Sequence, residues 1–198
     1  MSTPISTSTK KNLPRSTAEP TVVLGIDPGT LVTGFAVVSR RAGRLSLSEC
    51  GTIENAGSDL LPARLKHIYH RLSSLIEEYH PDECAIESAF YGKNAQSALK
   101  LGHARGVAML AAVERDLPTA EYSPREVKRA VVGTGSASKE QVQFMVKALL
   151  RLADSAMMLD ASDAIAIALC HIQRMGRPLA IVRDWKSFVA AHPERVRA

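Results

Sequence analysis

The chain has 198 residues, of which 45% are hydrophobic and 23% are charged, and this composition is typical of one globular domain with a buried core. No apolar stretch approaches the ~20 residues that span a bilayer, so we expect no membrane-spanning helix and no membrane partner. The cysteines stand far apart without a Cys-x-x-Cys pair, so we expect neither a zinc site nor disulfides, and a reducing compartment, the cytoplasm: Cys50, Cys84 and Cys170.

The net charge of +5 is unevenly distributed along the chain. Residues 92–151 hold ten Lys and Arg against five Asp and Glu, whereas residues 21–91 and 152–171 are each negative by three charges. Two acidic blocks in an otherwise basic chain fit a polyanion partner and a local cation site. Ordinary solvated surfaces produce similar imbalances, so the charge pattern alone leaves both interpretations open.

Residues 1–20 precede the predicted domain. They are rich in Ser and Thr, mildly basic, and lack the apolar core of a secretory signal, so we interpret them as a disordered tail. A transit peptide is the weaker alternative, because the segment is short and poor in Arg.

The pattern of apolar and turn residues predicts an α/β fold. Three β-rich segments form an antiparallel meander at residues 22–26, about 33–40 and 44–53. A helical apolar stripe follows over Leu60–Tyr79. The remaining elements are a strand at 83–88, a helix at Asn94–Asp116, a strand at 117–122, and helices that begin at Ser123-Pro124, at Ser138 and at Asp160. This order predicts a mixed sheet with helices on its faces.

Four acidic residues stand out by their positions in these elements. Asp27 ends the first strand directly before Pro-Gly, where an ordinary turn is the simpler explanation. Glu87 ends the buried strand 83–88, and a buried carboxylate is costly unless it is paired or bound to a cation. Asp160 and Asp163 share one face of the last helix, where helix capping and the helix dipole also explain them.

These acids suggest a metal site if the strands that carry Asp27 and Glu87 are neighbours. The carboxylates would then emerge side by side, with the last helix covering the same edge of the sheet. Clustered carboxylates stay ionised together only with a counter-charge, which Mg²⁺ supplies while it also binds phosphate oxygens. Two such ions clamp the attacking and leaving oxygens in phosphodiester hydrolysis.

Four stretches of the chain, taken together and in order, resemble the RuvC family of Holliday junction resolvases. They are LGIDPGTLVTGFAVV, AIESAFYGKNAQSALKLGHARGVAMLAA, SPREVKRAVVGTGSASKEQVQFMV and DASDAIAIALCH, and the resemblance covers about Val22 to His171. It implies a ribonuclease H-like fold, with a mixed five-stranded sheet and helices on both faces. It also implies a homodimer that cuts two opposing strands of a four-way DNA junction during recombination and repair, with RuvA and RuvB as branch-migration partners.

The resemblance also assigns roles to individual residues. It implies that two Mg²⁺ ions, for which Mn²⁺ can substitute, are bound by the catalytic acids Asp27, Glu87, Asp160 and Asp163. Phe90 matches an aromatic residue that stacks on a base at the opened crossover. Lys128 and Lys139 match basic residues that contact the substrate, and we add Lys93, from the loop after Phe90, as a further DNA contact. Residues 21–174 are then the nuclease domain, and residues 175–198 a basic C-terminal extension.

The predicted helix at Asn94–Asp116 has small residues spaced by four, including Gly102 and Gly106. Glycine in a helix interior costs ~1 kcal/mol relative to alanine, so a close backbone approach is a plausible reason for it. The partner could be the protein's own sheet or a second subunit, and the resemblance favours the subunit.

Three other functions compete with this interpretation. The GIDPGT stretch also resembles the phosphate loop of actin-like ATPases and sugar kinases, but those proteins need two such lobes and further glycine-rich motifs. A junction-binding module without catalysis would not need all four acids. Another ribonuclease H-like nuclease, acting on a hybrid or a simple duplex, would use the same acids.

Overall fold

The computed structural model describes residues 20–88, 95–152 and 159–175. Within these residues the elements follow the predicted order: β1 (Thr21–Asp27), β2 (Val32–Arg41), β3 (Arg44–Glu54), α1 (Leu61–Tyr79), β4 (Glu83–Glu87), α2 (Ala95–Val113), β5 (Thr119–Tyr122), α3 (Pro124–Val132), α4 (Lys139–Leu150) and α5 (Leu159–Arg174).

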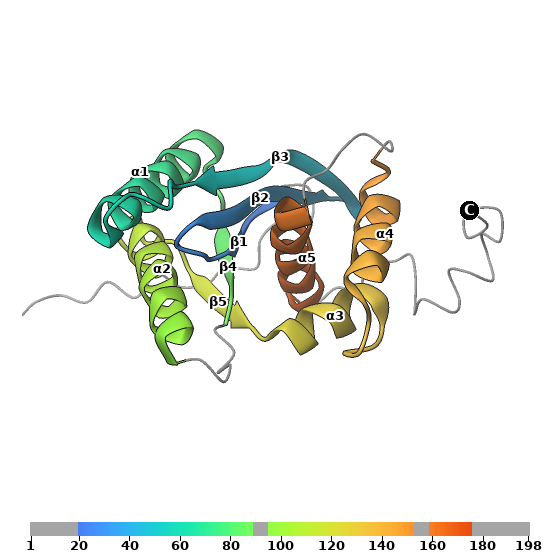
Figure 1. Cartoon of the computed structure of the whole chain (residues 1–198). Helices are drawn as coiled ribbons and strands as arrows, with labels where there is room; N and C mark the ends of the chain where they lie inside the picture. Colours follow the sequence, from blue (N-terminus) through green and yellow to red (C-terminus); the bar gives the residue numbers. More distant parts are fainter. Residues whose placement is uncertain (1–19, 89–94, 153–158, 176–198) are drawn as a thin grey trace, which may run out of the picture.

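The five strands form one mixed sheet in the order β3-β2-β1-β4-β5 (Figure 1). β1 pairs antiparallel with β2 and parallel with β4, and β5 extends the parallel half. The predicted meander followed by parallel strands is therefore confirmed. β1 lies in the centre, where both of its edges are paired.

Helices cover both faces of the sheet, as predicted (Figure 1). Alternation along β1 divides its side chains between two cores. Val23 packs in the core under α3, α4 and α5, whereas Leu24 and Ile26 pack in the core under α1 and α2. Since both faces of β1 are buried, its sequence is a nearly continuous apolar run until Asp27.

The end of α2 and the start of β5 differ from the predicted positions by two or three residues. α2 ends at Val113 instead of Asp116, because the chain turns there and Asp116 has a left-handed φ of 52°. β5 begins at Thr119 instead of 117, after Pro118, which has no N–H to donate to a sheet. Neither difference moves a candidate site residue.

Serine caps fix the starts of α3 and α4, as predicted. Ser123 and Glu126 form a capping box at α3, and Ser138 and Gln141 form another at α4. Each box satisfies two backbone N–H groups that would otherwise lack partners. The first residues of both helices, which lie near the carboxyl ends of β4 and β5, are therefore held rigidly.

The cysteines behave as expected from the sequence. All three are free, and Cys84 and Cys170 are buried. Burial raises the pKa of the Cys84 thiol to about 12, so this cysteine acts as a small apolar side chain. Among the helices of the described residues, none is long and apolar enough to cross a bilayer.

Candidate active site

Asp27 and Glu87 end two neighbouring parallel strands. Ile26 of β1 is paired with Ile86 of β4, so the next residue on each strand leaves the sheet at the same edge. The side chains of Asp27 and Glu87 share a hydrogen bond. The predicted convergence of these two acids is confirmed.

The turn after Asp27 is closed by a buried threonine. The Thr33 hydroxyl donates to the Gly29 carbonyl oxygen at 2.6 Å and accepts from the Gly29 N–H at 3.3 Å. Thr33 is fully buried, so the loop between β1 and β2 has an internal anchor. The turn and the metal-site explanations of Asp27 therefore coexist: Thr33 anchors the turn, and the Asp27 carboxyl group faces Glu87.

Glu87 has a strongly perturbed carboxyl group. Burial raises its pKa to about 8, and the negative charges of Asp27 and Asp163 and the hydrogen bond with Asp27 add to the increase. Lys139 acts in the opposite direction. Near neutral pH this edge therefore holds more acidic groups than it can keep ionised without further positive charge.

Asp163 reaches the cluster from α5, on the face of the sheet covered by α3 and α4. Its Oδ2 atom lies 2.7 Å from the Nζ atom of Lys139, the first residue of α4. Three acids from β1, β4 and α5 thus interact at one edge, with one lysine among them.

A glycine in β1 allows α5 to approach this closely. A Cβ atom at Gly25 would lie 2.2 Å from the carbonyl oxygen of Ala164 and 2.9 Å from the Cβ atom of Ala168. Any side chain at Gly25 would push α5 away from β1. Because Asp27 lies two residues after Gly25 and Asp163 directly precedes Ala164, this contact sets the spacing between the two acids.

Three of the predicted site residues lie wholly or partly outside the described part of the structure. Asp160 lies in the first turn of α5, three residues before Asp163, so its backbone position agrees with the predicted shared helix face. Its side chain is outside the described part of the structure. Phe90 and Lys93 lie outside the described residues altogether.

A cleft of about 210 Å³ opens beside Glu87 and Asp163. Both predicted basic residues are in its lining, Lys128 on α3 and Lys139 on α4. The remaining lining residues are Pro124, Val127, Val142 and Ala166. Lys128 also lowers the pKa of Glu140, after larger contributions from hydrogen bonds to Ser138 and to the Glu140 backbone. The cleft therefore joins the acidic cluster to a basic wall.

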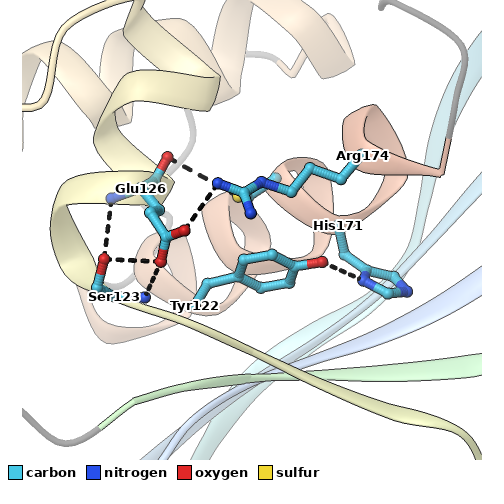
Figure 2. Close-up of polar contacts among 6 residues, drawn as sticks. Tyr122, Ser123, Glu126, His171 and Arg174 are labelled. Carbon is cyan, nitrogen blue, oxygen red and sulfur yellow. Dashed lines mark hydrogen bonds and ion pairs between the residues drawn. The ribbon is translucent and has the colours of Figure 1, made fainter.

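A polar network ties α3, which forms one wall of this cleft, to the far end of α5 (Figure 2). Arg174 of α5 donates to Glu126 at 2.8 Å and lies over the Tyr122 ring at 5.1 Å. The Glu126 carboxylate also accepts from the Ser123 N–H at 2.9 Å, and these contacts lower the Glu126 pKa.

The same network continues into the core. The hydroxyl group of Tyr122 lies 2.7 Å from His171 Nδ1 (Figure 2). The other ring nitrogen, His171 Nε2, lies 2.9 Å from Glu83 Oε2. His171 is only 4% exposed, and these two contacts give each of its ring nitrogens a protein partner. This buried chain holds β5, β4 and α5 together behind the cleft.

The donors that converge here are carboxylates, which suit a hard divalent cation such as Mg²⁺. Among the side chains that the structure describes, no three Asp, Glu, His or Cys residues form a ready metal-binding group. Asp163 is paired with Lys139 instead. The acids that are described fit a cation in kind and in charge.

The sequence interpretation missed Gly25, Thr33 and the pairing of Lys139 with Asp163. A glycine inside a strand is a signal of close backbone approach, so Gly25 could have been noticed. Thr33 and the lysine pair left no comparable signal in the sequence.

Comparison with known proteins agrees with this geometry. The family model described as crossover junction endodeoxyribonuclease RuvC matches residues 23–171. The chain belongs to the RuvC family. The RuvC of Bacteroides fragilis is 46% identical over 182 residues, which cover 89% of this chain and 96% of that protein. The RuvC of Saccharophagus degradans is 53% identical over 151 residues, covering 76% and 87% of the two chains.

A solved RuvC structure has the same fold. Thermus thermophilus RuvC in complex with Holliday junction substrate superimposes with a TM-score of 0.74 at 33% identity, covering 79% of this chain and 96% of that chain. The ribonuclease H-like fold expected from the resemblance is therefore confirmed.

Proposed function

We propose that this RuvC-family chain is a Holliday junction resolvase, which cuts two opposing strands of a four-way DNA junction by Mg²⁺-dependent hydrolysis in recombination and repair. The observation that carries the proposal is the convergence of Asp27, Glu87 and Asp163 at one sheet edge, beside a cleft lined by Lys128 and Lys139. Relatives named crossover junction endodeoxyribonuclease cover most of the chain, and one solved relative holds a Holliday junction.

The acids would hold the metal and the lysines the DNA. Asp27, Glu87, Asp160 and Asp163 are the proposed ligands of two Mg²⁺ ions, or of Mn²⁺ in their place. When bound, these cations supply Lewis-acid stabilisation of the phosphodiester under attack. Glu87 must give up its proton to act as a ligand. Lys128 and Lys139 bind backbone phosphates, as does Lys93. Phe90 stacks on an exposed base near the crossover.

We propose that the active form is a homodimer that associates through α2. Large apolar side chains on this helix are exposed, with Leu99 at 66%, Leu110 at 50% and Val113 at 61%. Gly102 and Gly106 lie among them in the helix, and beyond the adjacent residues and the helix's own backbone no described atom lies within 4 Å of a Cβ built on either glycine. The protein's own sheet therefore does not explain these glycines, whereas a second copy of α2 would use them for close approach. Two identical sites related by a two-fold axis suit symmetric cuts.

Sedimentation tests the dimer. The wild-type protein should sediment as a dimer at micromolar concentration. Leu110→Arg should make it a monomer, and Leu60→Arg, on the loop before α1, should leave it a dimer. A monomeric wild type, with and without junction DNA, would overturn this part of the proposal.

Family membership also supports RuvA and RuvB as the proteins that deliver the junction. Residues 21–174 are the proposed nuclease domain, and residues 1–20 and 175–198 are tails attached to it. Co-migration of the chain with a RuvA–RuvB–junction complex tests this partnership.

Cleavage of three substrates side by side tests the activity. A synthetic four-way junction, a nicked duplex and an RNA–DNA hybrid are incubated with the protein in Mg²⁺ and in chelator. We expect symmetric cuts in the junction only, and only with Mg²⁺. Asp27→Asn should bind the junction without cutting it. Preferred cutting of the hybrid would assign a different ribonuclease H-like substrate, and cutting in chelator would remove the role of the acids.

A further inference from the structure

Lys139 and Asp163 form an ion pair inside the acidic cluster. The lysine Nζ atom lies 2.7 Å from Asp163 Oδ2, and both residues line the cleft beside Glu87. An ordinary surface salt bridge would join a lysine to an acid on the solvated face of its own helix. This lysine instead crosses from α4 to α5 and places its charge on one of the acids proposed to hold a metal.

We propose that Lys139 is a tethered counter-ion, which occupies the cation position beside Asp163 until junction DNA draws it away, so that metal loading is coupled to substrate binding. This inference rests on the proposed function of the site.

A lysine and a divalent cation compete for this carboxylate. Mg²⁺ requires nearly ideal octahedral geometry, with ligand oxygens at about 2.0–2.1 Å. A protonated amine at hydrogen-bond distance from this carboxylate repels the metal ion and occupies one of the carboxylate's acceptor sites. Metal binding at Asp163 therefore needs Lys139 to move.

The structure allows Lys139 to move while its backbone stays in place. The capping box of Ser138 and Gln141 fixes the first turn of α4. The lysine side chain itself is 43% exposed on a flexible four-carbon stem. A DNA phosphate in the cleft offers its ammonium group an alternative partner, since lysine binds phosphate as a point charge.

Lys128 provides an internal comparison. It lines the same cleft from α3, and its charge acts on Glu140 of α4. Removing either lysine takes one positive charge from the cleft. Only the removal of Lys139 takes the ion pair away from Asp163.

The consequence is reciprocal coupling between DNA and metal. DNA that engages Lys139 raises the metal affinity of the acids, and bound metal raises the affinity for DNA by the same factor. Without DNA, the lysine neutralises part of the acids' charge, so the acids bind metal weakly. Lys139 is thus a positioning residue for the cation in addition to a phosphate contact.

Mn²⁺ binding to the full-length protein, measured by electron paramagnetic resonance of the free ion without DNA, tests the proposal. Lys139→Met should bind Mn²⁺ at least about fivefold more tightly than the wild type, within the usual range of coupling factors. Lys139→Arg should restore weak binding. Lys128→Met, the matched control, should stay within twofold of the wild type.

A second arm adds a four-way junction with phosphorothioate linkages at the crossover. The junction should raise the Mn²⁺ affinity of the wild type and have a smaller effect on Lys139→Met. Unchanged or weaker Mn²⁺ binding by folded Lys139→Met would overturn the proposal. If that protein fails to fold, Lys139→Gln is judged by the same criterion. A wild type that cuts no junction would instead count against the proposed function, so the two failures are distinguishable.

Discussion

Replacing Gly25 by alanine tests whether the contact between β1 and α5 sets the geometry of the acids. The new Cβ atom would lie 2.2 Å from the Ala164 carbonyl oxygen, whereas ordinary contacts begin at 3.4 Å. The helix and the strand must therefore move apart by about 1.2 Å. Asp27 lies two residues after Gly25, and Asp163 lies directly before Ala164, so the distance between their carboxylates changes by a similar amount.

That displacement is large compared with the tolerance of metal–ligand distances, whereas its cost to the stability of the fold is modest. Ligand distances in metal sites are fixed to within about 0.2 Å, and a 1 Å misplacement of catalytic groups costs about 100-fold in rate. Overpacking of a core typically costs about 1–3 kcal/mol of stability. We therefore expect Gly25→Ala to cut junctions about 100-fold more slowly while it remains folded and binds junction DNA.

The assay is single-turnover cleavage of a four-way junction in Mg²⁺, with thermal unfolding and a gel shift on the same preparation. Gly57→Ala is the matched control, because a Cβ built there meets no described atom within 4 Å other than those of the adjacent residues. Cleavage by Gly25→Ala at the wild-type rate, with unchanged stability, would refute the reasoning about helix approach.

Three further predictions concern single side chains. Glu87 has a pKa of about 8 when folded, against 4.5 for an unperturbed glutamate, so metal-free protein should lose stability as pH rises from about 4.5 to about 8. Urea unfolding in chelator should show this slope, and Glu87→Gln should flatten it; equal slopes would contradict the prediction. Tyr122→Phe leaves Nδ1 of the buried His171 without its hydrogen-bond partner and should cost about 1–3 kcal/mol by urea unfolding. Tyr79→Phe removes an exposed hydroxyl group and should cost little. Phe90→Ala should lower junction cleavage but barely change the gel shift, because phosphate contacts supply most of the affinity for the junction; equal loss of both would argue against base stacking.

The sequence predicted the sheet because its local signals agree with the tertiary structure. Strand β1 is an almost unbroken apolar run, and Ser123 and Ser138 carry the cap chemistry that starts α3 and α4. The last residues of α2 and the start of β5 were less predictable, because a left-handed turn at Asp116 and the adjacent Pro118 decide them.

The acids could be chosen from the sequence because each stands near one end of an apolar element. Asp27 and Glu87 close buried strands, and Asp163 begins an apolar helix. Their convergence depended on whether β1 and β4 are neighbours, which no local pattern decides. The sheet order supplies that information.

Contacts between distant elements could not be predicted. The link between Tyr122, His171 and Glu83 joins residues separated by 49 and 88 positions. Lys139 was expected to touch DNA, and its sequence context gave no sign that it would contact Asp163. Such pairs depend on how α4 and α5 pack, which follows from many weak apolar contacts.

Anomalous diffraction from Mn²⁺ in crystals of the protein bound to a four-way junction tests the central claim most directly. The account predicts Mn²⁺ within coordination distance of carboxylate oxygens of Asp27, Glu87 and Asp163, with the Lys139 amine moved onto a DNA phosphate. Mn²⁺ bound elsewhere at the scissile phosphate, with these three acids uncoordinated, would contradict it.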